Sequence, residues 1–151
     1  MAYKVVTAPT VEPFTRAFVK TWLKIPASVT AEDTIVDELI IAARSWAEQG
    51  TGRALMTQTI EEYFDCWPIC GVRLSVAPIQ SVSSIQYLSG GSYVTWNSAN
   101  YNTDLVTEPC RITLKNTGQI PNYDSATTNV IKVTYVAGHT ATTAIPRTTM
   151  Q

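Results

Sequence analysis

The sequence is poor in charge and in cysteine, and each shortage narrows what the chain can do. Only 15% of its 151 residues are charged, against roughly 25% in typical soluble domains. The formal net charge is −1, so the whole chain offers no electrostatic attraction for nucleic-acid phosphates. The three cysteines are an odd number, which argues against a secreted disulfide framework. We therefore expect a reduced chain that folds in the cytosol.

Catalytic and metal-ligating side chains are equally scarce. Cys66 and Cys70 are separated by three residues rather than the two of a redox motif, and with one further cysteine and the single histidine, His139, they do not complete a zinc site. No nucleophile elbow, phosphate-binding loop or dinucleotide fingerprint is present. Glu61 and Glu62 are adjacent, so on a strand their carboxylates point to opposite faces and cannot act as a pair. We predict a protein that is not an enzyme and has no metal or cofactor.

Long apolar runs are also missing. No stretch of about 18 apolar residues occurs, so we predict no membrane-spanning segment. Residues 1–6 lack the apolar run and cleavage site of a signal peptide. A chain of 151 residues has the usual size of one domain. Such a chain buries roughly 68–70% of its unfolded surface, so it can build a core without disulfides or a metal.

The charges that are present gather unevenly. Residues 32–65 hold eight acidic side chains against two basic ones, whereas residues 1–31 and 66–151 carry net charges of +3 and +2. One interpretation of this acidic block is a solvated helix face. The alternative is a surface that faces a basic partner, or the wall of a DNA conduit that must not bind DNA strongly.

A first helix is predicted to start near Thr15, a good N-cap residue. Pro26 disfavours helix at the residue before it and ends the pattern. Between these limits, apolar side chains recur at spacings of four, four and three, which is the helical period; they are Phe14, Phe18, Trp22 and Ile25.

A second helix, predicted over residues 31–49, is the clearest element. Thr30 precedes it as N-cap, Asp33 follows in capping-box position, and Gly50 and Gly52 are C-cap candidates. Its apolar residues form two adjacent stripes, one of Ile35, Leu39, Ala42 and Trp46 and the other of Val36, Ile40, Ala43 and Ala47. A face this wide predicts cover on more than one side, so the helix is either all core or half core and half subunit interface.

After Gly52 the apolar period changes from helical to alternating, which predicts six or seven short strands. They cover residues 57–64, 72–76, 82–88, 93–96, 101–105, 111–115 and 130–136, with a polar loop over 116–129. Helices followed by strands favour an α+β fold with an antiparallel β-domain. We divide the one compact domain into an N-terminal helical region (1–55), a β-domain (56–138) and a C-terminal arm or truncated helix (139–151).

The sequence contains four tryptophans and seven tyrosines. Such aromatics are usually core or interface anchors, although they can also stack on nucleic-acid bases. A further reading from a different class is a carbohydrate- or ligand-binding β-module that exposes Trp67, Trp96 and Tyr101.

Residues 42–55, with the strand start at 57–59, resemble a recurring signature of the head–tail connector (adaptor) proteins of tailed bacteriophages. In that family a long helix ending in Thr-Gly-Arg leads into a strand, as it does here at residues 51–53. Three other segments agree in the same order: 14–25 with the family's short first helix, 74–88 with its central strand pair, and 133–146 with its last strand and the entry to a C-terminal helix.

The resemblance implies a homo-oligomeric ring, a dodecamer, docked under the portal protein at the capsid vertex of the virion and assembled in the host cytoplasm. Such a ring extends the DNA channel, touches the packaged DNA passively, and offers a platform to the stopper or tail-completion protein. Another virion ring component, a stopper or tail terminator, is the alternative. Closed rings need two different contact faces per subunit. For the subunit or portal interface we single out Trp22, Ile40, Arg44, Trp46, Arg53, Pro146, Arg147 and Met150.

The sequence departs from the family pattern at two places. Phe18 stands where an acidic residue is expected three positions after Thr15. The given sequence ends five residues after Pro146, before the helices that follow this position in the family and contact the portal there. Either the natural chain is longer, or it ends as an arm. We expect the segment from Ile145 onward to reach the portal.

Overall fold

The computed structural model describes residues 2–68 and 70–141. Over these residues the protein has two α-helices, a 3-10 turn and eight strands. In chain order these are β1 (Ala2–Thr7), α1 (Arg16–Trp22), α2 (Asp33–Thr51), β2 (Gln58–Phe64), β3 (Val72–Arg73), β4 (Ile79–Ser89), β5 (Ser92–Thr95), η1 (Ser98–Asn100), β6 (Tyr101–Asp104), β7 (Arg111–Leu114) and β8 (Ile131–Ala137). Every pairing between these strands is antiparallel. The predicted α+β class is confirmed.

The strands form two sheets. Five strands pair in the order β1-β2-β8-β4-β5, and three pair in the order β3-β7-β6. β1 and β5 are the edges of the larger sheet, while β2 and β8 lie inside it and bury every second residue. Strict alternation of this kind is what a half-buried antiparallel strand requires.

The apolar core joins the two sheets. Ile60 on β2, Ile85 on β4 and Val133 on β8 belong to the same buried cluster as Val72 on β3 and Ile112 on β7. This cluster closes the β region on itself, so its apolar side chains are covered within the subunit.

The carboxylate of Glu62 is buried beside this core. Glu62 on β2 has no exposed surface, and it accepts hydrogen bonds from the Tyr135 hydroxyl at 2.9 Å and from the Ser75 backbone N–H at 3.0 Å. Glu61 points to the other face, where Lys4 lies 3.0 Å away. The prediction that Glu61 and Glu62 occupy opposite faces is confirmed, because side chains alternate along a strand.

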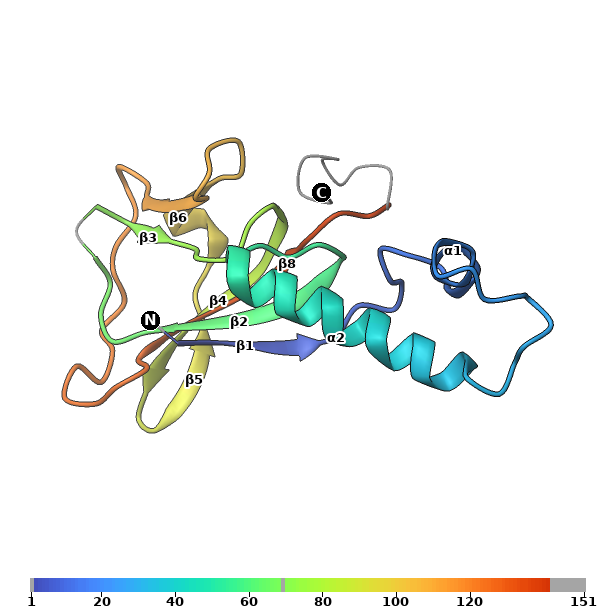
Figure 1. Cartoon of the computed structure of the whole chain (residues 1–151). Helices are drawn as coiled ribbons and strands as arrows, with labels where there is room; N and C mark the ends of the chain where they lie inside the picture. The colour runs from blue at the N-terminus through green and yellow to red at the C-terminus, as the bar shows by residue number, and fades with distance from the viewer. Residues whose placement is uncertain (1, 69, 142–151) are drawn as a thin grey trace.

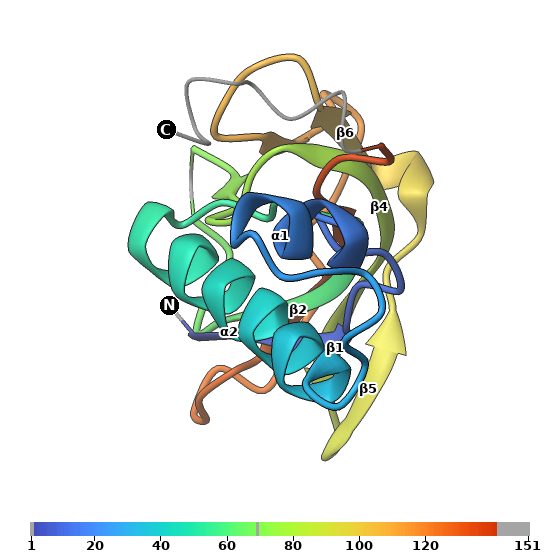
Figure 2. The same cartoon turned by 45° about the vertical axis from the view of Figure 1, so that its right-hand side comes forward.

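The helices lie apart from the apolar core. In Figure 1, α2 runs from beside the sheet to beyond the end of β1, and α1 lies near that far end. The turned view also places α1 next to α2 (Figure 2). The buried residues of α2, Val36 and Ile40, are not members of the core cluster. The helical pair is therefore a separate structural layer attached to the β region.

Several predicted boundaries need correction. β1 was not expected; it pairs only with β2, more than fifty positions away in the sequence. Thr30 is not the N-cap of α2, because the helix starts at Asp33 with Glu32 at the cap position and no side-chain capping bond. α1 ends at Trp22, before Pro26, because Lys24 adopts a left-handed conformation (φ 60°).

Other local predictions are confirmed. The Thr15 hydroxyl caps α1 by accepting a hydrogen bond from the Phe18 backbone N–H at 3.2 Å. Gly52 ends α2 in the left-handed conformation that glycine adopts without strain. The predicted C-terminal arm lies outside the described residues. Within the described ranges, no helix is long and apolar enough to cross a membrane.

Candidate assembly interface

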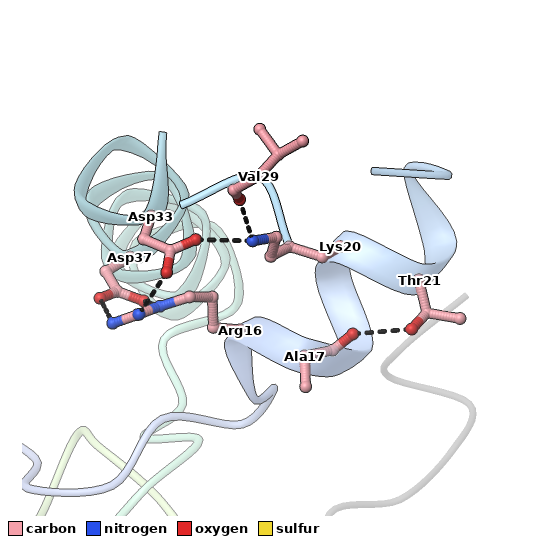
Figure 3. A network of polar contacts seen from close by, with 7 residues as sticks. All are labelled: Arg16, Ala17, Lys20, Thr21, Val29, Asp33 and Asp37. Atoms are coloured by element: carbon pink, nitrogen blue, oxygen red, sulfur yellow. Dashed lines mark hydrogen bonds and ion pairs between the residues drawn. The ribbon is translucent and has the colours of Figure 1, made fainter. Parts of the chain in front are cut away.

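The contact between α1 and α2 is made by charged side chains. Arg16 on α1 donates from Nε to Oδ1 of Asp37 at 2.8 Å and from Nη1 to Oδ2 of Asp33 at 2.9 Å. Lys20 donates from Nζ to Oδ1 of Asp33 at 2.7 Å and also to the carbonyl oxygen of Val29. Figure 3 shows both basic side chains reaching from α1 toward the two carboxylates of α2. The two helices are thus held together by polar contacts.

This network fixes the charge state of its members. Hydrogen bonds from Lys20 and Arg16 lower the pKa of Asp33 below its usual 3.8, and the Arg16 guanidinium lowers the pKa of Asp37 in the same way. The carboxylates in turn raise the pKa of Arg16. These shifts favour the charged forms of Asp33, Asp37 and Arg16 at neutral pH.

The face of α1 that points away from α2 is aromatic. With about 3.6 residues per turn, Phe18 and Trp22 lie on the side of the helix opposite Arg16 and Lys20. Phe18 is 56% exposed and Trp22 is 76% exposed. The ring of Phe14, just before the helix, stacks on Phe18 with centroids 5.4 Å apart. We call Phe14, Phe18 and Trp22 the aromatic face of α1.

The face of α2 that points away from α1 is apolar as well. Ile35 and Leu39 are each 60% exposed, Trp46 is 79% exposed, and Ala42 between them is also exposed. These four residues are the first of the two predicted stripes, and we call them the outer stripe of α2. The second stripe contributes the buried Val36 and Ile40. Among the described residues, α2 therefore buries part of the second stripe and leaves the outer stripe exposed.

A second polar cluster ties the C-terminal end of α2 to the β region. Glu48 accepts through Oε1 from the Leu55 backbone N–H at 2.8 Å and from Gln58 Nε2 at 3.1 Å. Arg44 donates from Nη1 to Glu48 Oε2 at 2.7 Å and from Nε to Glu12 at 2.8 Å. These contacts orient α2 relative to β2, and with it the outer stripe.

Arg53 links the end of α2 to the segment before β7. Its guanidinium makes a two-pronged contact with the Glu108 carboxylate, at 2.8 and 3.1 Å. This contact lowers the pKa of Glu108. The pair is about half exposed, so it lies at the surface of the subunit.

The acidic block of residues 32–65 does not form one free surface. Glu62 is in the core, and Glu61 pairs with Lys4 and Lys132. The other paired members are Asp33 and Asp37 with Arg16, and Glu48 with Arg44. Most of these carboxylates are engaged within the subunit, which removes the basis for a uniformly acidic wall facing DNA.

The aromatic residues that the alternative ligand-binding reading requires to be exposed are not exposed. Trp67 is 7% exposed and Trp96 is 5% exposed, and their rings pack edge to face with centroids 4.7 Å apart. Tyr101, half-buried, lies against Trp96 at 5.3 Å. The tryptophans are occupied as core anchors, so a ligand-binding β-module loses the feature that suggested it.

The eight residues singled out from the sequence fall in different environments. Trp22 and Trp46 are exposed on the two apolar faces, and Arg53 is at the surface. Ile40 is buried and the side chain of Arg44 is paired inside the subunit, so their assignment to an interface stays a prediction. The remaining three, Pro146, Arg147 and Met150, lie outside the described residues.

Five residues of the apolar faces were not among those eight: Phe14, Phe18, Ile35, Leu39 and Ala42. Phe18, Ile35 and Leu39 are all more than half exposed. Their helical spacing had been recognised, but spacing alone does not say which side of a helix is left uncovered. In the described part of the chain, no group of three or more His, Cys, Asp or Glu side chains is placed to hold a metal ion.

The fold of this chain is similar to that of chains in solved structures of gene transfer agent particles. No protein-family model matches the sequence, and no curated protein matches it. A chain from the structure "Virion of native gene transfer agent (GTA) particle" aligns with a TM-score of 0.78 and 18% identity, over 97% of this chain and 77% of that one. A chain from "Neck of empty GTA particle computed with C6 symmetry" gives 0.74 and 20%, over 97% and 76%. One from "Neck of native GTA particle computed with C12 symmetry" gives 0.64 and 16%, over 97% and 75%. The chain shares the fold of these proteins over nearly its whole length.

Proposed function

We propose that this protein is a structural subunit of the neck of a phage-like particle, where it forms a head–tail connector ring without catalytic activity. The observation that carries the proposal is that this chain, over 97% of its length, shares its fold with chains in structures of the neck of gene transfer agent particles. Two of those structures were computed with six-fold and twelve-fold symmetry. A ring, with twelve subunits as the expected number, is the matching assembly here.

The surface of the subunit supports assembly. Contiguous exposed apolar residues on a monomer usually mark an interaction site, and this chain has two such helix faces. Exposed tryptophan is a common anchor of protein interfaces because it buries a large area with few rotatable bonds. Trp22 and Trp46 are 76% and 79% exposed, one on each face.

In this function the ring docks under the portal protein, extends the DNA channel and carries the stopper or tail-completion protein. DNA must move through such a channel, so its wall should bind phosphates weakly, because each neutralised phosphate adds affinity. A net charge of −1 meets that condition, and the internal pairing of most acidic side chains leaves a surface of modest charge rather than a strongly acidic one.

The test is the native mass of the purified chain, alone and mixed with the portal protein of the same particle. The expected result is a discrete ring, or a complex with portal in which the chain is present in ring stoichiometry. A chain that stays monomeric in both conditions contradicts the proposal. A ring that binds the tail but not the portal assigns the chain to the tail-terminator position instead.

A further inference from the structure

We infer that neighbouring copies of this chain join head to tail through their helices, with the aromatic face of α1 on one subunit packed on the outer stripe of α2 on the next. This inference rests on the proposed ring function and specifies the contact that closes the ring. It makes the helical pair, rather than the β region, the main site of self-assembly.

The first reason is that the described residues of the subunit leave both faces uncovered. α1 meets α2 through Arg16 and Lys20, and α2 meets α1 through Asp33 and Asp37. Because residues on opposite sides of a helix are separated by about half a turn, the apolar residues of both helices point away from this contact. The ion pairs that hold the two helices together also keep their apolar faces turned outward.

The second reason is that the residue spacing of the outer stripe suits packing against a partner helix. The outer stripe of α2 has spacings of four, three and four, the pattern of a seam between packed helices. The small Ala42 lies between the larger Leu39 and Trp46, which leaves room for a bulky side chain from a partner helix. The aromatic face of α1 offers Phe18 and Trp22 as such side chains.

The length of α1 also matches that of the central part of the outer stripe. α1 contains seven residues, which at about 1.5 Å per residue is roughly 10 Å. The stretch from Leu39 to Trp46 on α2 advances by the same amount, roughly 10 Å. One short helix therefore covers the central part of the stripe.

The third reason is symmetry. A single subunit presents two different apolar faces that point away from each other, and one head-to-tail contact covers both. A contact between unlike faces is heterologous and repeats around an axis until the ring closes. Pairing of each face with itself instead creates two-fold contacts, which do not build a ring whose subunits all point the same way. The aromatic face of α1 is thus covered by the outer stripe of α2 of one neighbouring copy, and the outer stripe by the aromatic face of another.

The experiment uses two variants that each damage one face. Trp22→Asp places a charge on the aromatic face of α1, and Leu39→Asp places one on the outer stripe of α2. Both positions are exposed, so both variants should keep the wild-type circular dichroism spectrum. Val106→Asp is the matched control, since Val106 is 93% exposed but lies in the loop between β6 and β7.

Native mass spectrometry then measures assembly, with portal protein added if the wild-type ring requires it. We expect Val106→Asp to form wild-type rings and each helix variant alone to form none. Mixing the two helix variants should yield a dimer with one copy of each and nothing larger, because only one intact contact is left. Wild-type rings from Trp22→Asp or Leu39→Asp, or a dimer of either variant alone, overturn the inference while leaving the ring function standing. Failure of the wild-type chain to form rings overturns both.

A cross-link detects the same contact if the mixed dimer is too weak to survive measurement. In a background with Ser at the exposed Cys66 and Cys70, chains carrying Trp22→Cys are mixed with chains carrying Ala42→Cys under oxidising conditions. We expect a disulfide-linked dimer from this mixture. Mixing Val106→Cys with Ala42→Cys should give none. Equal cross-linking in the two mixtures contradicts the contact.

Discussion

The β region and the helical pair use the same residue type in opposite ways. Trp67 and Trp96 pack against each other in the β core, whereas Trp22 and Trp46 are almost fully exposed on the helices. The β region buries one cluster of apolar residues between its two sheets, although its edge strands β1 and β5 leave others, such as Val5 and Val94, exposed. The helical pair is joined by ion pairs and turns its apolar residues outward. The β region therefore supplies the buried core of the subunit, and the helical pair supplies the two exposed apolar faces that we propose as contacts with a partner.

The strongest test of this difference compares apolar truncations in the two regions. Ile112→Ala removes a side chain with no exposed surface, and we expect the free energy of unfolding to fall by roughly 2–5 kcal/mol. Leu39→Ala removes an exposed side chain, and we expect a change within about 0.5 kcal/mol in the unassembled chain. Urea denaturation at protein concentrations too low for ring formation measures both. Similar losses at the two sites contradict the division.

A smaller effect is expected from the buried carboxylate of the β core. Glu62→Gln keeps the shape of the side chain but replaces one accepting oxygen with a donor, facing the donors of Ser75 and Tyr135. Burial and the charge of Glu62 raise the pKa of Tyr135 well above its usual range, so its hydroxyl remains a donor. We expect the free energy of unfolding to fall by about 1–3 kcal/mol.

Glu61→Gln provides the control for this substitution, because the adjacent carboxylate lies on the other face of β2 and pairs with Lys4. A change of about 1 kcal/mol or less is expected there. The same denaturation assay measures both variants, and an equal loss for the two contradicts a special role for the buried carboxylate.

The helical pair is expected to respond to acid before the β region does. The pKa values of Asp33 and Asp37 are lowered in the folded chain from their usual 3.8. The stabilisation from these groups is therefore complete above the usual pKa and is lost as the pH falls through the lowered values. We expect amide exchange in α1, corrected for its intrinsic pH dependence, to rise below about pH 3.8 while exchange in β8 stays slow.

The double substitution Asp33→Asn and Asp37→Asn is the control for the acid response. It removes both titrating carboxylates from the contact with Arg16 and Lys20. Exchange in α1 should then be faster at neutral pH and should change little on acidification. An acid response that survives the double substitution assigns the effect to other groups.

Local signals in the sequence predicted much of the fold. The Thr15 cap and the Gly52 stop depend only on neighbouring residues, and the alternation along β2 and β8 follows from burial of one sheet face. β1 was missed because its partner β2 lies more than fifty residues away in the sequence, so no hairpin turn between them indicates the pairing. Thr30 was misassigned because residues 31 and 32 form a turn before the helix, in which the Asp33 backbone N–H donates to the Thr30 carbonyl at 3.2 Å. The helix therefore starts at Asp33, with Glu32 at the cap position.

The candidate interface could be only partly predicted, for a different reason. The two stripes of α2 are equally apolar in sequence, so periodicity cannot say which one is covered. Asp33 and Asp37 turn toward Arg16, and Glu48 binds the start of β2. These long-range polar contacts decide that Val36 faces inward and Trp46 faces outward. The same dependence on tertiary contacts hid the burial of Trp67 and Trp96.

The smallest effect is expected where the two regions meet at the surface. Arg53, just after α2, pairs with Glu108 in the β region, and both side chains are about half exposed. Solvent screens such a pair, so Arg53→Ala should lower the free energy of unfolding by only about 0.2–1 kcal/mol. Ring formation should be unchanged, because the stripe of α2 is oriented by Glu48 and Arg44 instead. Denaturation and native mass measure the two readouts, and loss of the ring in Arg53→Ala shows that this surface pair belongs to the interface between subunits.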